Sequence, residues 1–158
     1  MTDDTAPLPH RHLLTLSLDV DAASAAQIGT TPEGRRSIAP IVGGSFEGER
    51  LCGTVVPGGA DWVRFRADGT MMIDVRLTLK TAGGAVIYMA YEGRFIGGTN
   101  AMAELAQGKT LAPGSYSLVT VAKFECGDPD YMWLNDVVAV GVGEQSGFNP
   151  VYSLYEIG

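Results

Sequence analysis

The sequence has few of the residues that build metal sites and classical catalytic triads. It contains only two cysteines, Cys52 and Cys126, far apart and outside any CxxC spacing, so nothing indicates a structural zinc site. We expect two buried free thiols in preference to a disulfide. The two histidines, His10 and His12, lie near the amino terminus, where we expect exposed side chains that bind no metal. This scarcity disfavours a His-based triad, and we expect no cofactor.

Positive charge and long apolar runs are also scarce. Lys and Arg number 11 against 18 Asp and Glu, for a net charge of −7, which argues against binding of nucleic acid or of an anionic membrane surface. No segment approaches the apolar length of a membrane span. The start, MTDDTAPLPHRH, has no apolar stretch behind a basic one, as a secretory signal would have. We therefore expect a cytoplasmic protein.

What the chain does contain is typical of an all-β domain. Of its 158 residues, 46% are apolar and 21 are glycine, and Gly, Pro, Asn and Asp separate short alternating segments. A turn of helix is predicted at 22–26, and a short helix at NAMAELAQGK, capped by Asn100 and ended by Gly108. Antiparallel strands that close into a barrel leave no free edge. We therefore predict a flexible segment over 1–11 and one barrel of roughly eight strands over 12–158, with strands at 12–20, 37–41, 44–56, 61–67, 71–80, 85–95, 115–125, 134–142 and 151–157.

Ionisable residues interrupt the apolar segment from Gly58 to Thr81, and strand register predicts where they point. A two-residue turn at Asp68-Gly69 would set Asp61 opposite Arg76, and a loop of two or four residues at TAGGA would set Arg76 opposite Tyr91. An apolar wall with a few convergent polar groups is typical of a small-molecule pocket. Since side chains alternate along a strand, one face of these strands would carry such a mixture of apolar and polar side chains. Its residues are Asp61, Val63, Phe65, Met72, Asp74, Arg76, Thr78, Met89 and Tyr91.

Structural explanations of these residues stand beside the pocket. In one alternative, Asp61 and Arg76 form a partly buried ion pair. In another, Asp74 lies on the solvent-exposed face of a half-exposed sheet. An odd loop length or a bulge would exchange the two faces. The opposite face would be an apolar packing face or an outer face that builds a homo-oligomer, around Ile73, Val75 and Leu77.

The segment GRRSIAPIVGGSFEGERLCGTVVPGGADWVRFRADG resembles the signature of the DUF3237 (UPF0311) family, with its GG-x-FEG and PGGADW elements and DG turn. DVRLTLKTAGGAVIYMAYEGRF, FECGDPDYMWLNDVVAVGVGEQ and VYSLYEI are similar to the family too, so the match runs from Leu13 to Ile157. The resemblance implies a calycin-like barrel, similar to that of allene oxide cyclases, with a cavity at one end. It implies no particular reaction, because the family has no assigned function. The chain departs from the family at Glu49, where proline often follows FEG, and at TAGGA, which lacks an aspartate.

The family elements and the mixed face together supply the candidate residues. A carboxylate shielded by an aromatic ring would have a raised pKa and serve as a general acid or base. Asp61 is the first choice and Glu47 the second, although tight pairing with Arg76 would lower the pKa of Asp61 and pass the role to Asp74 or Glu47. Arg76 and Tyr91 would polarise a carbonyl. Candidate substrate-binding residues are Trp62, Phe65, Met72, Met89, Glu125, Trp133 and Asn135.

We therefore expect a cofactor-independent acid/base enzyme of the isomerase, cyclase or hydro-lyase type, acting on a small, partly apolar, carbonyl-containing metabolite. The alternative is a non-catalytic carrier or sensor, because a barrel interior can enclose one small ligand. A binder can leave carboxylates out of its cavity, whereas an acid/base enzyme needs one there despite the desolvation cost. A small molecule is the expected partner in both cases, and a homo-oligomer is compatible with either.

Overall fold

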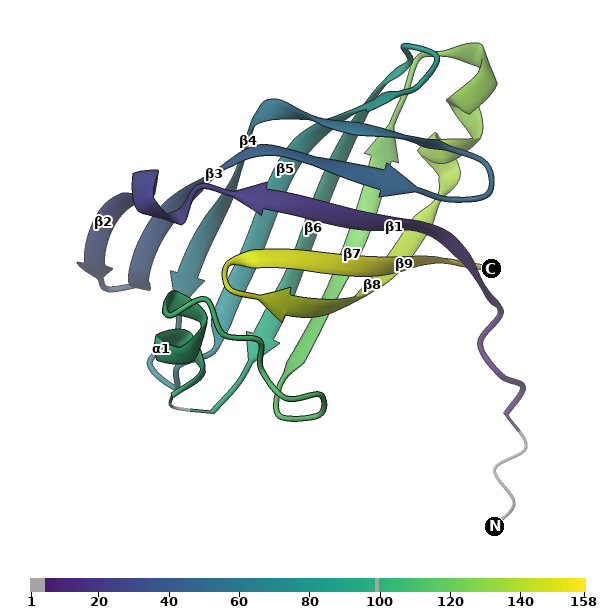
Figure 1. The fold of residues 1–158 in the computed structure, drawn as a ribbon. Coiled ribbons are helices and arrows are strands. Elements are labelled where there is room, and N and C mark those ends of the chain that lie inside the picture. Colours follow the sequence, from purple (N-terminus) through teal and green to yellow (C-terminus); the bar gives the residue numbers. More distant parts are fainter. Residues whose placement is uncertain (1–4, 99) are drawn as a thin grey trace.

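The structure is a computed structural model that describes residues 5–98 and 100–158, and its nine strands form one antiparallel sheet that closes into a barrel (Figure 1). The sheet order is β1-β9-β8-β7-β6-β5-β4-β3-β2, and pairing of β1 with β3 closes the ring. Eight strands therefore form the barrel and β2 is an extra strand, which confirms the predicted fold. The strands are β1 (His10–Val20), β2 (Ala26–Thr31), β3 (Gly34–Glu47), β4 (Cys52–Phe65), β5 (Met71–Thr81), β6 (Val86–Ile96), β7 (Ser117–Glu125), β8 (Val138–Ser146) and β9 (Asn149–Ile157).

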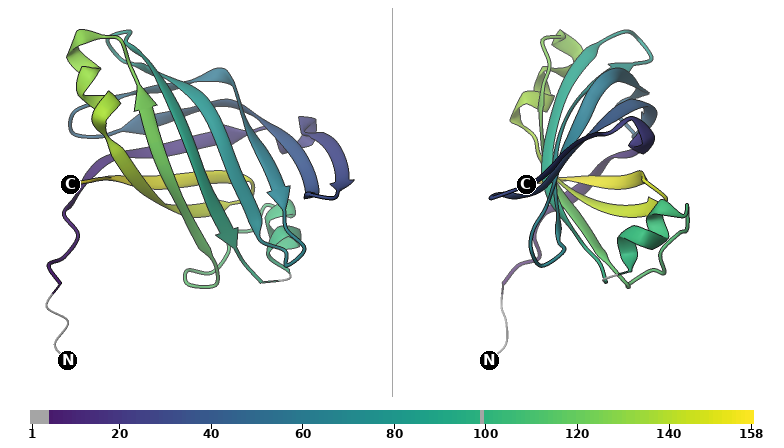
Figure 2. Two further views of the ribbon diagram at one scale, coloured as in Figure 1. Left: turned by 180° about the vertical axis from the view of Figure 1, so that it is seen from behind. Right: turned by 90° about the vertical axis from the view of Figure 1, so that its left-hand side faces the viewer.

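Helical segments lie at the two ends of the barrel. The 3-10 turn η1 (Ala22–Ser24) and α1 (Ala101–Ala106) lie at the end where β2 projects, and the 3-10 segment η2 (Pro129–Asp136) lies at the other (Figures 1 and 2). α1 is the single α-helix of the described residues and matches the predicted short helix. Asn100 is its N-cap, but the Asn100 side chain makes no capping hydrogen bond. Gly108 follows the helix with φ +75°, a conformation that glycine adopts readily.

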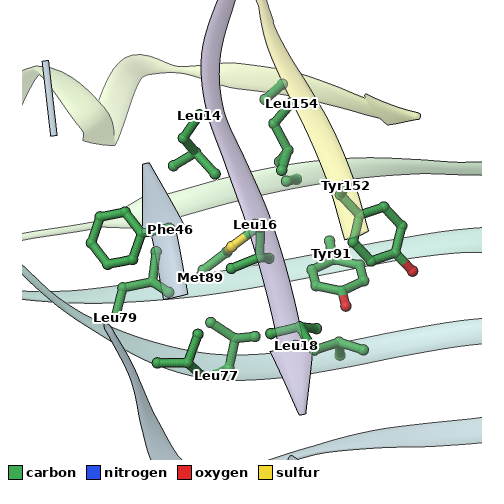
Figure 3. Close-up of a cluster of buried hydrophobic side chains, with 14 of the residues drawn as sticks. Leu14, Leu16, Leu18, Phe46, Leu77, Leu79, Met89, Tyr91, Tyr152 and Leu154 are labelled. Carbon is green, nitrogen blue, oxygen red and sulfur yellow. The ribbon is translucent and has the colours of Figure 1, made fainter. Parts of the chain in front are cut away.

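Alternation along the strands separates the barrel interior from its outer surface. In β7, exposed and buried residues alternate without a break, as expected for a strand with one buried face. The same alternation in β1, β5, β6 and β9 turns large apolar side chains inward (Figure 3). Their removal from water is the main stabilising contribution to the fold. The cluster includes Leu14, Leu16, Leu77, Leu79, Met89 and Leu154.

Several predicted strand boundaries are wrong. The predicted strand at 44–56 is the end of β3, a turn and the start of β4, because the Gly48 N–H donates to the Leu51 carbonyl at 2.8 Å. β2 was not predicted, since its residues are exposed or half-buried and show no buried stripe. η2 occupies the start of the predicted strand at 134–142. β1 begins at His10, and residues 1–4 of the predicted flexible segment lie outside the described residues.

Two predictions about exposure also need correction. Both cysteines are free, but Cys52 is exposed and only Cys126 is buried. The face proposed for oligomer contacts lies inside the barrel, where Ile73, Val75 and Leu77 are at most 3% exposed. Exposed apolar side chains lie instead on the outer surface of β7, β8 and β9, and include Val119, Val121, Val138, Val142 and Val151.

Candidate functional site

A cavity of about 250 Å3 lies at the end of the barrel that carries η1, β2 and α1. Its walls are largely apolar, and Met102 and Leu105 of α1 cover one side. A few polar side chains also line it, as is usual for small-molecule sites. They are Arg35, Ser37, Asp61, Tyr91, Gln145 and Tyr152, with Gln27 at the rim.

Asp61 is placed in the cavity by an interruption of the ladder between β4 and β5. The two strands are paired at Asp61 and Val75, and pairing resumes at Arg64 and Met72. Between these pairs the Asp74 N–H donates to Asp61 Oδ1 at 3.1 Å, and the Trp62 carbonyl accepts a hydrogen bond of 2.7 Å from Arg36. Backbone groups that would otherwise pair across the ladder are thus satisfied by side chains, as buried backbone groups must be. The Asp61 carboxyl is thereby fixed on the inner face.

Burial raises the pKa of Asp61 from 3.8 to about 7. Among the smaller influences, the Asp74 N–H lowers this pKa, the Asp74 carboxylate raises it, and the Arg36 guanidinium lowers it. The cavity leaves part of Asp61 accessible, but protein surrounds the carboxyl closely enough for desolvation to dominate. A carboxyl group with a pKa near 7 is present in both protonation states at neutral pH, as general acid–base catalysis requires.

Charged side chains on the outer surface of the sheet should therefore shift the pKa of Asp61, whose carboxyl group lies on the inner face. Asp74→Asn is expected to lower the pKa of Asp61, because it removes a negative charge and keeps the backbone N–H bond. Arg36→Gln is expected to raise this pKa, because it removes a positive charge. A pH titration of the Asp61 carboxyl carbon by 13C NMR measures both shifts, with Glu125→Gln, at the far end of the barrel, as control. Shifts in the same direction in both variants would contradict this account.

Tyr91 of β6 and Tyr152 of β9 meet inside the barrel, edge to face, with ring centroids 5.3 Å apart. Both hydroxyl groups point to the same side, away from Phe46 and Leu79 (Figure 3). Burial first, and then the Tyr152 phenol and the Asp61 charge, raise the pKa of Tyr91 well above 10. Burial and the Asp61 charge likewise raise the pKa of Tyr152. Both phenols therefore stay protonated at neutral pH and can donate hydrogen bonds into the cavity.

A glycine of β8 makes room for this tyrosine pair. Gly143 is paired with Tyr152 in the ladder between β8 and β9. A Cβ atom at Gly143 would lie 2.8 Å from a carbon of the Tyr152 ring and 2.5 Å from the Leu118 side chain. The absence of a side chain at Gly143 therefore lets the Tyr152 ring lie against the barrel wall.

The structure brings together only some of the predicted site residues. Asp61, Phe65 and Tyr91 line the cavity, and Met89 is fully buried in the apolar cluster. Trp62, Met72, Asp74 and Arg76 lie on the outer surface. There Arg76 is 3.9 Å from Asp74 and 5.3 Å from the Trp62 ring centroid. The predicted pair of Asp61 with Arg76 is therefore wrong, since Asp61 pairs with Val75.

Two odd-numbered loops explain this error. Arg66 N–H bonds to the Thr70 carbonyl and Thr81 N–H to the Ala85 carbonyl, so each hairpin loop has three residues. Each loop ends in a glycine of positive φ, Gly69 at +85° and Gly84 at +96°, as is common for three-residue hairpin loops. Two- or four-residue loops had been predicted, and a shift of one residue moves every side chain to the opposite face.

The remaining predicted residues lie at the other end of the barrel. Glu47 and Glu125 are exposed there, and the Trp133 ring lies under the Arg50 guanidinium at 3.9 Å. The Asn135 side chain accepts from the Cys126 N–H at 3.1 Å and donates to the Cys126 carbonyl at 2.8 Å. These contacts tie η2 to the end of β7, as a structural role would require.

Four polar residues of the cavity wall, and Gln27 at its rim, were missed from the sequence. Tyr152 and Gln145 come from the last two strands, and Arg35 and Ser37 from the start of β3. Alternation with buried apolar neighbours was the available signal, for example Tyr152 two residues before Leu154. It could not tell which end of the barrel each residue reaches, because that depends on how the strands are staggered.

Within residues 5–98 and 100–158, no group of three or more His, Cys, Asp or Glu side chains is arranged to hold a metal ion. Over the same residues, no helix has the length and apolar character needed to cross a bilayer.

Comparison with known proteins places the chain among relatives that share its fold. A UPF0311 protein from Rhodopseudomonas palustris is 30% identical over 154 residues, which cover 97% of this chain and 99% of that protein. A crystal structure of a β-barrel-like protein from Acinetobacter baumannii is 36% identical, with a TM-score of 0.83 and coverage of 99% of both chains. A structure described as an enzyme from Penicillium herquei has a TM-score of 0.71 and covers both chains fully, but at 20% identity it shows the fold alone.

The family comparison covers nearly the whole chain. Residues 9–157 match the family described as "Protein of unknown function (DUF3237)". The chain belongs to the DUF3237 family.

Proposed function

We propose that the chain is a cofactor-independent acid/base enzyme whose substrate is a small, partly apolar carbonyl compound bound in the barrel cavity. The observation that carries the proposal is the Asp61 carboxyl, with a pKa of about 7, in a largely apolar cavity that it shares with two protonated phenols. Burying a carboxylate in such surroundings is costly, and perturbed carboxyl groups in cavities concentrate at functional sites. A non-catalytic binding barrel would gain little from a carboxyl group in this position.

In the proposed reaction, ionised Asp61 removes a proton from the carbon next to the carbonyl. The electron pair of that C–H bond moves onto the carbonyl oxygen, and the resulting enolate accepts hydrogen bonds from Tyr91 or Tyr152. The Asp61 carboxylic acid then returns its proton to another carbon in an isomerisation. In an elimination the enolate instead expels a hydroxyl group from the neighbouring carbon, and this group takes the proton from the Asp61 carboxylic acid as its C–O bond breaks and leaves as water.

The raised pKa values of the two tyrosines support this division of roles. A phenol that stays protonated can stabilise an enolate oxygen without giving up its proton, whereas Asp61 exchanges a proton readily near pH 7. The neighbour from Penicillium herquei is described as an enzyme, so the fold is compatible with catalysis, although a fold does not specify a reaction.

A ligand screen followed by a conversion assay tests the proposal. Enones, hydroxy-ketones and lactones that raise the Tm of the protein are incubated with it, and the products are analysed by mass spectrometry and NMR. We expect at least one ligand to be converted, with turnover lost in Asp61→Asn, lowered about 100-fold in Tyr91→Phe, and kept in the matched control Glu47→Gln. Ligands that bind and return unchanged would favour a carrier instead, and conversion that survives in Asp61→Asn would assign the chemistry to other residues.

A further inference from the structure

Arg35, at the mouth of the cavity, stands apart from every other arginine of the chain. Among the described residues, its guanidinium has neither a salt bridge nor a hydrogen-bond partner. Each of the other seven contacts an oxygen atom. Five of them form ion pairs: Arg11 and Arg50 with Glu156, Arg64 with Glu33, Arg66 with Asp68, and Arg76 with Asp74. The other two donate hydrogen bonds to backbone carbonyls, Arg36 to that of Trp62 and Arg94 to that of Gly93.

The Arg35 side chain is nevertheless held in place. Its Cζ atom lies 4.1 Å from the centroid of the Phe65 ring, and the two residues are paired across β3 and β4. Stacking on an aromatic face orients the guanidinium plane and uses none of its N–H groups. An oriented guanidinium without an oxygen partner is prepared to bind a planar anion through two parallel hydrogen bonds.

Two acidic residues near the mouth already contact other arginines. Glu33 is paired with Arg64 at 3.9 Å, and Asp68 is paired with Arg66. The net charge of −7 gives the protein no general attraction for anions. An anion bound here would therefore owe its affinity to the local contact with Arg35.

The strand geometry sets the distance between this cation and Asp61. Arg35, Ser37 and Ala39 line the cavity in turn along β3, and Ala39 is paired with Asp61. Four residues of strand span about 13 Å. Apolar side chains, including Val63 and Met71, line the cavity along with these residues.

We propose that Arg35 binds the carboxylate of an amphipathic organic acid, whose apolar body fills the cavity and whose carbonyl group lies beside Asp61 and the two phenols. The substrate class would then be a medium-length oxo acid. This assignment rests on the proposed acid/base function for its carbonyl end, and on Arg35 alone for its carboxylate end.

Binding of two matched probes tests the carboxylate end. Octanoate and octanamide have the same apolar chain, and only octanoate carries a charge. By isothermal titration calorimetry at pH 7, we expect the wild-type protein to bind octanoate at least about tenfold more tightly than octanamide, as a charge-assisted bidentate contact would give. Arg35→Met should abolish this preference and leave octanamide binding unchanged. Arg35→Lys should keep part of the preference, because it retains the charge without the planar fork.

Arg64→Met is the matched control, since Arg64 lies on the neighbouring strand and is paired with Glu33; it should bind both probes as the wild type does. The proposal is overturned if octanoate binds no more tightly than octanamide, including the case in which neither binds, or if Arg35→Met keeps the preference. Asp61→Asn separates the two proposals. If this variant still prefers octanoate and still converts a substrate, only the acid/base function fails. If the wild type shows no preference and Asp61→Asn has lost turnover, only the carboxylate assignment fails.

Discussion

Asp61→Asn is expected to remove catalytic turnover and, at pH 8, to make the protein more stable. Loss of a general acid or base lowers rates by about 100- to 10,000-fold. Asparagine keeps the size of the side chain and an oxygen that can accept the Asp74 N–H bond. It also removes the charge that burial disfavours. A variant that loses activity and gains stability is the expected result when a functional group is held in place against its own desolvation cost.

The pH dependence of the stability follows from the raised pKa of Asp61. Between pH 3.8 and about 7 the folded protein keeps a proton on Asp61 that the unfolded chain has released. The free energy of unfolding therefore falls as the pH rises through this range, and the Asp61 contribution is constant above it. A shift of this size corresponds to at most about 4 kcal/mol. Asp61→Asn should thus have about the stability of the wild type at pH 4 and exceed it by about 1–4 kcal/mol at pH 8.

Thermal and urea unfolding from pH 4 to pH 8 would measure this difference. Asp136→Asn, at an exposed aspartate of η2, is the matched control and should show no pH-dependent gain. If the difference between Asp61→Asn and the wild type were the same at pH 4 and pH 8, Asp61 would not titrate with a raised pKa, and the acid/base proposal would lose its main support.

The sequence predicted the barrel, because alternation and turn residues are local signals. It also placed Asp61 and Tyr91 on one face, but only because the errors in the two loop lengths cancel: each reverses the face once, so Asp61 and Tyr91 both face the same side as Val75. It misassigned Asp74 and Arg76, because the face of a strand depends on whether a hairpin loop has an even or an odd number of residues. Nothing in ADG or AGG alone distinguishes a two-residue loop from the three-residue loops that form. Tyr152 could not be predicted as a partner of Tyr91, since their contact across the barrel arises only when β9 and β3 pair with β1.

Two of the three glycines of the GG-x-FEG element have a structural explanation in the closure of the barrel. Gly44 and Gly48 lie where β3 and the turn after it pass β1. A Cβ atom at Gly44 would lie 2.1 Å from the Ser17 carbonyl oxygen, and one at Gly48 would lie 2.1 Å from the Leu13 carbonyl oxygen. Only glycine lets the two backbones approach this closely. The GG-x-FEG element, which is typical of the family, therefore has a structural role in closing the barrel. The proposed chemistry depends on side chains elsewhere.

Gly44→Ala is accordingly expected to be among the most destabilising single substitutions in the chain. Gly44 has φ +138°, so alanine would combine backbone strain of about 1–3 kcal/mol with an overlap that costs about 1–3 kcal/mol more. Urea unfolding of two further variants separates these contributions. Gly58→Ala has the strain without the overlap, since Gly58 has φ +120° and open space around it. Gly83→Ala has neither and should be neutral. If Gly44→Ala were no less stable than Gly58→Ala, the approach of β3 to β1 would tolerate a side chain, and the GG-x-FEG glycines would need an explanation other than closure.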